Sequence, residues 1–123
     1  MAAPAESVSA LSVRTTALGR LADLLCLETG WDGESAIAPS PLAVRNAIRF
    51  LVELPPGNTP DIGPGLDGSI EMEWELPERP MVSLTFEGSG TAYFTAFTPD
   101  RVLEEFECEV DGALTSAVVN ILG

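Results

Sequence analysis

The stretch from Leu66 to Glu75, LDGSIEMEWE, decides the fold that the sequence predicts. It begins at a turn pair, Asp67-Gly68, and then alternates strictly between apolar and polar residues. Successive side chains of a β-strand point to opposite faces, so this pattern predicts a strand with one apolar and one acidic face. The apolar side holds Ile70, Met72 and Trp74, and the polar side holds Ser69, Glu71, Glu73 and Glu75.

The remaining segments supply helices and further strands. Apolar residues at helical spacing predict a helix over Ser7–Thr29, ended by Gly30. Ser40-Pro41 is a helix start that leads to a second helix ending near Leu54. The proline- and glycine-rich residues 55–68 are expected to be a connector. The further predicted elements are the strands Ser69–Glu75, Met81–Glu87, Thr91–Phe97 and about 105–110, with Arg101–Glu105 as an alternative helical turn, and a short helix after Asp111.

These elements predict an α+β fold in the order α-α-β-β-β-β-α. We expect a four-stranded antiparallel meander with helices on one face and water on the other. Residues 1–6 are expected to be a flexible tail, and residues 7–123 a single domain. The chain shows no long apolar run and no signal-peptide pattern, so a cytoplasmic protein is the expectation.

Part of the chain resembles a known family. Residues 30–97 resemble small uncharacterised bacterial proteins that carry WDG-x-x-A-x-P, a helix ending in Leu-Pro, and DG-x-I-x-x-x-W. One extra residue stands before the proline here. The resemblance implies the order of the elements but no activity and no catalytic residue. The matching residues are Trp31, Asp32, Gly33, Ala36, Pro39, Leu54, Pro55, Asp67, Gly68, Ile70 and Trp74.

The charge of the chain is strongly and unevenly negative. Nineteen acidic residues stand against six arginines, there is neither lysine nor histidine, and the net charge is −13. Such a field repels nucleic acid and anionic membranes, so we expect no direct binding to either. It attracts basic proteins and speeds their encounter. Solubility alone is the simpler explanation of the charge.

Six glutamates form two alternating ladders. Like charges placed directly opposite on adjacent strands destabilise a sheet, so the two ladder strands should not pair with each other. We expect these side chains either to be solvated or to bind a basic partner. The two ladders are Glu71, Glu73 and Glu75, and Glu105, Glu107 and Glu109.

The residue types exclude most familiar catalytic sites. Without histidine, a Ser-His-Asp triad and histidine metal sites are excluded, and without lysine so are a P-loop and a Schiff base. Carboxylates such as Asp32, Asp61 and Asp67 leave a carboxylate-based enzyme as a third hypothesis, although aspartates in such loops more often build turns. No catalytic residue, metal site or cofactor is predicted.

The leading hypothesis is therefore a non-enzymatic acidic protein that binds a basic, nucleic-acid-handling partner. Such a protein would be inhibitor-like, antitoxin-like or an anti-defence factor, and could imitate nucleic-acid phosphates. The alternative is a structural or assembly subunit that associates, for example with itself, through the strand Thr91–Phe97. Both faces of that strand are apolar, and its predicted contact residues are Ala92, Phe94 and Ala96.

Trp31 and Trp74 could stack on a ligand, but core positions are the simpler expectation, with Trp31 filling the space between the first helix and the sheet. Cys26 and Cys108 are expected to be buried free thiols, with a disulfide as the alternative.

Overall fold

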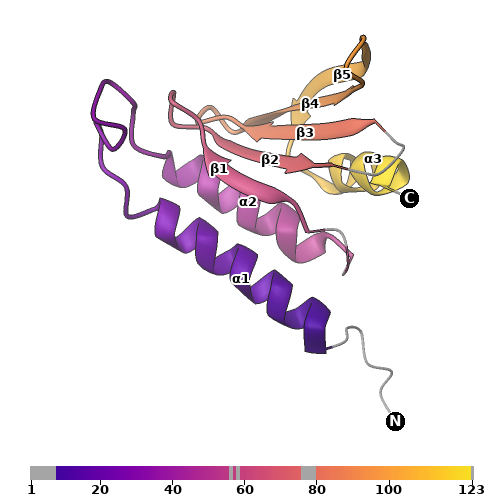
Figure 1. The fold of residues 1–123 in the computed structure, drawn as a ribbon, viewed down its shortest axis with the longest axis horizontal. Coiled ribbons are helices and arrows are strands. Elements are labelled where there is room, and N and C mark those ends of the chain that lie inside the picture. Colours follow the sequence, from indigo (N-terminus) through magenta and orange to yellow (C-terminus); the bar gives the residue numbers. More distant parts are fainter. Residues whose placement is uncertain (1–7, 56, 58, 76–79, 123) are drawn as a thin grey trace.

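The computed structural model describes residues 8–55, 57, 59–75 and 80–122. It has the predicted α+β fold, in which helices cover one face of an antiparallel sheet (Figure 1). The described part holds three helices and five strands, one strand more than predicted. The elements are α1 (Val8–Leu24), α2 (Pro41–Glu53), β1 (Asp61–Pro64), β2 (Ile70–Trp74), β3 (Met81–Phe86), β4 (Thr91–Phe97), β5 (Val102–Glu109) and α3 (Gly112–Leu122).

The additional strand is β1, within the segment predicted to be only a connector. It pairs antiparallel with β2, with Asp61 opposite Glu73 and Pro64 opposite Ile70. Prolines and glycines are typical of loops, so the sequence of this segment did not indicate a strand. An edge strand tolerates them because it needs ladder hydrogen bonds on one side only. The prediction of four strands was therefore wrong by one edge strand.

The five strands follow one another in the order β1-β2-β3-β4-β5, so the sheet is a meander as predicted. Both β3 and β4 lie between the two glutamate-bearing strands, β2 and β5. The expectation that these two strands do not pair is confirmed. Residues 102–105 belong to β5 and do not form a helical turn. A register shift between Ala96 and Phe97 marks a bulge in the pairing of β4 with β5.

The first helix is shorter than predicted. α1 ends at Leu24, and the chain continues in tight turns in which Leu27 N–H donates to Leu24 O at 3.2 Å. Gly30 has the expected positive φ of 87°, but it lies inside the following loop. There its N–H donates to Ala36 O at 2.7 Å, so this glycine closes a loop and does not end the helix.

The second helix begins as predicted. Ser40 is the N-cap and its hydroxyl accepts a hydrogen bond from Ala43 N–H, while Pro41 occupies the first turn. One polar residue of α2 is buried. The side chain of Asn46 donates to Gly90 O at 3.3 Å and so ties α2 to the β3–β4 hairpin.

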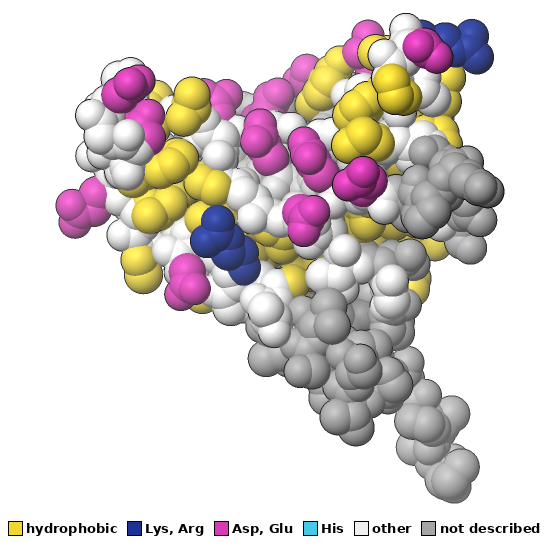
Figure 2. Space-filling view, viewed as in Figure 1, with side chains coloured by type: hydrophobic (Ala, Val, Ile, Leu, Met, Phe, Trp, Pro, Cys, Tyr) yellow, Lys and Arg dark blue, Asp and Glu magenta, His cyan; other side chains and the backbone are white. Residues whose placement is uncertain are grey.

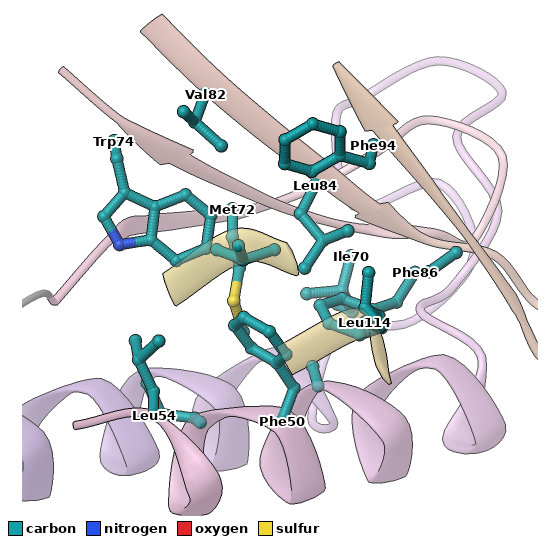
Figure 3. Close-up of a cluster of buried hydrophobic side chains, with 14 of the residues drawn as sticks. Phe50, Leu54, Ile70, Met72, Trp74, Val82, Leu84, Phe86, Phe94 and Leu114 are labelled. Atoms are coloured by element: carbon teal, nitrogen blue, oxygen red, sulfur yellow. The ribbon is translucent and has the colours of Figure 1, made fainter. Parts of the chain in front are cut away.

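The core lies between the helices and the covered face of the sheet. Phe50 of α2 points from the helix layer toward the sheet, where Met72, Trp74 and Phe86 lie (Figure 3). Its ring packs edge-on against Trp74 at 6.0 Å and tilted against Phe86 at 5.7 Å. Trp74 is therefore a core residue, as the sequence predicted. α3 joins the same cluster through Leu114, Val118 and Leu122.

The expected tail, residues 1–6, lies outside the described residues, as does Ser7 at the start of the expected domain. Within the described residues, no helix combines the length and the apolar character needed to cross a membrane.

Replacing Phe50 by alanine should destabilise the fold by about 3–5 kcal/mol, because it removes two aromatic contacts and leaves a cavity under the sheet. Urea unfolding followed by circular dichroism measures this loss. Val52→Ala on the exposed side of the same helix is the matched control and should change the free energy of unfolding by no more than about 0.5 kcal/mol. A loss below about 1 kcal/mol for Phe50→Ala would contradict this core.

Candidate functional site: the open face of the sheet

The face of the sheet away from the core carries both glutamate ladders. On β2, Ile70, Met72 and Trp74 are buried, so Glu71 and Glu73 between them point to the opposite face. On β5, the register places Glu105 and Glu107 opposite Thr95 and Tyr93, which alternate with the buried residues of β4. All four glutamates are exposed and lie on this open face.

Two rows of residues cross the open face from one ladder to the other. Each row starts at a glutamate on β2, crosses β3 and β4, and ends at a glutamate on β5. Three strand spacings separate the two carboxylates of a row, which is about 14 Å. The first row is Glu71, Thr85, Tyr93 and Glu107, and the second is Glu73, Ser83, Thr95 and Glu105.

Between the glutamates of these two rows, the centre of the open face is neutral and rich in hydroxyl groups. Glu109 extends the β5 side, where it lies opposite Thr91. Glu75 follows the last residue of β2 and is exposed. Figure 2 shows acidic side chains gathered over the strands. We call this surface, two carboxylate ladders on either side of a hydroxyl strip, the acidic face.

The structure adds Asp61 to the acidic face. Asp61 of β1 lies directly opposite Glu73, and both line a hollow of about 250 Å³ together with Glu71. Like charges directly opposite one another on neighbouring strands destabilise a sheet, so this arrangement costs stability unless a positive charge offsets it. Sequence reasoning considered Asp61 only as an enzymatic carboxylate, because β1 and its pairing were not recognised.

Glu87 is a second acidic residue that the sequence analysis did not assign to this face. Its carboxylate accepts a hydrogen bond from the Thr91 hydroxyl at 2.9 Å, across the β3–β4 hairpin. The strict alternation of Met81–Glu87 places Glu87 beside Thr85 and Ser83, and this signal was present in the sequence.

Tyr93 links the hydroxyl strip to the β5 ladder. Its phenol donates a hydrogen bond to the Glu105 carboxylate. This bond raises the pKa of Tyr93 above its ordinary value of 10.0, and the charges of Glu105 and Glu107 act in the same direction. The phenol therefore stays neutral and remains a donor across the physiological pH range.

The aspartates of the two motif segments build turns. Asp32 accepts hydrogen bonds from Glu34 N–H at 2.9 Å and Ala36 N–H at 3.2 Å. Asp67 accepts from the N–H and the hydroxyl of Ser69, and these bonds lower its pKa. A general acid at neutral pH needs a raised pKa, so Asp67 is unsuited to that role.

Backbone contacts join the two motif segments to each other. Ile37 N–H donates to Leu66 O at 2.9 Å, and Ser40 N–H donates to Gly68 O at 2.8 Å. Gly68 has a φ of +88° and a Cβ there would meet Ala38 O at 3.2 Å, so this position requires glycine. These residues hold the loop before α2 against the β1–β2 hairpin.

The sequence suggested that Trp31 fills the space between α1 and the sheet, but the structure places it elsewhere. It is partly exposed, and its indole N–H donates to Ile37 O at 3.3 Å within its own loop. The aromatic ring therefore stabilises the loop that follows α1.

The predicted apolar interface on the strand Thr91–Phe97 is wrong. Ala92, Phe94 and Ala96 lie in the core and are at most 3% exposed. Pairing with β3 sets them beside the buried residues Val82, Leu84 and Phe86, and thereby decides which of the two apolar faces of β4 is covered.

The two cysteines are free, as predicted, but they are less buried than expected. Cys26 is exposed, and its thiol donates to Ala22 O at 3.8 Å. Cys108 is half-buried on the covered side of β5. Burial raises the pKa of its thiol, and the charges of Asp111 and Glu107 add to this effect.

A larger hollow of about 370 Å³ lies between α1 and β1 and meets the acidic face at Asp61; its lining also includes Ala17, Arg20, Pro60 and Ile62. Across the described ranges of the chain, no three acidic or cysteine side chains are grouped so that they could hold a metal ion.

Comparison with known proteins finds no family model, no curated protein and no solved structure that matches this chain. The resemblance to the bacterial family therefore remains an expectation from the motifs.

The hydrogen bond between Tyr93 and Glu105 gives a direct test of this geometry. Tyr93 is the one tyrosine of the chain, so the ultraviolet absorbance of phenolate reports its titration alone. We expect a midpoint above 10, and a shift toward 10 in Glu105→Gln because the charged acceptor is lost. Stability contributed by this contact should be present below pH 10 and decline as pH rises through the titration of Tyr93 in the folded protein.

Glu73→Gln is the matched control for this titration. It removes the same charge from the same row of the sheet, but Glu73 stands two strands away from Tyr93. An equal shift in both variants would contradict a specific bond to Glu105.

Proposed function

We propose that this chain is a non-enzymatic interaction protein whose acidic face binds the basic surface of a partner protein. One observation carries the proposal: the register of the sheet gathers both carboxylate ladders on its single open face. Residues far apart in the sequence thus form one charged surface. The partner-binding residues are Glu71, Glu73, Glu75, Glu105, Glu107 and Glu109, with Asp61 added from the structure.

Electrostatics favour a basic partner for two reasons. A net charge of −13 steers cationic proteins toward the chain over a distance set by the ionic strength. The ladders then offer several carboxylates at once. A single exposed ion pair contributes only about 0.2–1 kcal/mol, so useful affinity requires many such pairs on one surface.

The hollow at Asp61, Glu71 and Glu73 is the part of the acidic face best suited to a single arginine or lysine. A cation there would relieve the repulsion between the opposed Asp61 and Glu73 carboxylates.

A nucleic-acid-handling protein is the partner class that fits this surface. Such proteins neutralise phosphates with clustered arginine and lysine side chains. The two carboxylate ladders, separated by the hydroxyl strip, present negative charge in an arrangement similar to two phosphate strands beside a groove. Occupation of the partner's basic surface would exclude nucleic acid, which is an inhibitory or antitoxin-like role.

The test is affinity capture from the native host at low and high salt, followed by titration of the captured partner with variants. Glu71→Gln, Glu73→Gln and Glu107→Gln combined should weaken binding by about tenfold or more, since three pairs are lost together. Binding should also weaken as salt rises, and nucleic acid should compete.

The matched control is Asp23→Asn, Glu28→Gln and Glu34→Gln combined. These three residues are exposed on α1 and the loop that follows it, and their replacement removes the same total charge. Equal weakening by both triple variants would mean that net charge alone, not the acidic face, drives binding. Capture of acidic partners, or indifference to salt, would contradict the proposal itself.

An assembly role remains the second candidate, at a different place from the one predicted. Ile37 is 54% exposed and Leu66 is 65% exposed, and the two residues are joined by a backbone hydrogen bond. Hydrophobic side chains gather beside this loop and the β1–β2 hairpin in Figure 2. Exposed apolar side chains that cluster in this way are typical of interfaces.

Sedimentation at increasing concentration tests the assembly role. If the loop and hairpin form an interface, the protein should associate with itself, and Leu66→Ser should return it to a monomer. Val52→Ser on α2, equally exposed and apolar but away from this junction, should leave the association unchanged. A monomer at all concentrations would count against the candidate.

A further inference from the structure

The two edges of the sheet are protected in different ways. β1 and β5 are the outermost strands, and each has one side that pairs with no strand in the described part of the chain. An unpaired edge presents backbone N–H and C=O groups that can bind another strand. Which residues present those groups follows from the alternation of hydrogen-bonded and non-bonded pairs in antiparallel sheets.

The β3–β4 hairpin fixes this alternation for β5. Glu87 N–H donates to Thr91 O at 2.9 Å, so these two residues form a bonded pair. Every second pair along the hairpin is then bonded, and Tyr93 and Thr95 turn their peptide groups toward β3. Phe94, between them, turns its groups toward β5.

On β5, the residues that bond to β4 are consequently those opposite Ala92, Phe94 and Ala96. Cys108, Phe106 and Glu104 occupy these positions. The alternate residues, Glu105, Glu107 and Glu109, direct their peptide groups to the outer edge. The residues that form the β5 ladder are thus the same residues whose backbone is free to pair.

The same alternation of bonded and non-bonded pairs applies to β1, and there a hydrogen bond from Arg20 verifies it. Gly65 N–H donates to Ser69 O at 2.9 Å, which makes Ile62 and Pro64 the outward-facing residues of β1. Arg20 Nε donates to Ile62 O at 3.3 Å, from outside the sheet. Pro64 has no N–H to offer. An incoming strand at the β1 edge would therefore lose two of the backbone hydrogen bonds that an open edge offers.

In the described part of the chain, the feature that protects the β5 edge is its charge. A second copy of β5 would set glutamate against glutamate, which repels. A basic strand meets no such obstacle. In an antiparallel arrangement, its residues opposite Glu105, Glu107 and Glu109 would both exchange backbone hydrogen bonds with them and project side chains on the same face.

We propose that β5 is a docking edge for an extended segment of a partner protein that carries arginine or lysine at alternate positions. The segment adds a sixth, antiparallel strand beside β5. Three bonded pairs provide up to about six backbone hydrogen bonds, and each basic side chain lies directly opposite a glutamate. The basic character of the partner rests on the proposed function, whereas the open edge is independent of it.

The test uses synthetic peptides as long as β5, eight residues, in which arginine alternates with threonine or valine. In one version the backbone nitrogens of the arginine residues are methylated. In the other version the backbone nitrogens of the intervening threonine or valine residues are methylated. Both versions keep the charge of the unmodified peptide. Arginine methylation should weaken binding at least about tenfold because it removes the N–H groups that face β5, and the other methylation should have little effect.

Hydrogen exchange locates the docking on the protein. Binding of the unmodified peptide should slow exchange at the amides of Glu105, Glu107 and Glu109. The amides of Phe106 and Cys108 already pair with β4 and serve as internal controls. A peptide bound only by its charges would leave the three glutamate amides unprotected.

A protein variant separates the backbone from the charge. Glu107→Pro removes one outward N–H together with the carboxylate, and Glu107→Gln removes the carboxylate alone. The proline variant should bind about fivefold more weakly than the glutamine variant, the effect of one net hydrogen bond. Thermal unfolding of both variants verifies that β5 still pairs with β4, since proline is tolerated where the N–H faces solvent.

Equal affinity of the two methylated peptides would overturn the docking edge and leave the proposed function standing. Failure of the unmodified peptide to bind at low salt would overturn the docking edge and also count against the acidic face. Failure of host capture to find a basic partner would contradict the proposed function and with it the basic character of the docked segment, while the peptide tests still decide whether the β5 edge binds a strand.

Discussion

Antiparallel pairing in one continuous register is the constraint on which the rest of this structure depends. Side chains alternate between the two faces with a period of two, so the pairing of β2 with β3 and of β3 with β4 fixes the face of every residue on all three strands. The register places Ile70, Leu84 and Phe94 together under the helices. Together with the pairing of β4 and β5, it places Glu71 and Glu107 on the same exposed face.

The covered face holds the register in place. Phe50 packs against both Trp74 and Phe86, so one residue of α2 bridges two neighbouring strands. A slip of one residue would expose these rings and bury glutamates, at a cost of several kcal/mol per buried charge. The apolar core thus keeps mutually repelling carboxylates on one surface, where three strand spacings separate the two ladders.

The sequence allowed much of this to be predicted. The alternation of Ile70–Trp74, the cap at Ser40 and the turn at Asp67-Gly68 are local signals, because each depends on residues close together in the chain. The end of α1 could not be predicted, since the bond from Gly30 to Ala36 depends on the path of the whole loop. β1 was missed because its prolines and glycines fit a loop as well as an edge strand.

The sequence by itself determined the alternation of apolar and polar residues in the strands, the start of α2 and the negative charge. All of these are properties of short segments or of composition. Tertiary structure alone decided which apolar face of β4 is covered, since Phe94 and Tyr93 differ little until β3 is placed beside them. It also decided that the two glutamate ladders share a face and that Asp61 joins them. The physical reason is that a face of a sheet is made by strands distant in the chain, and only their pairing sets one residue beside another.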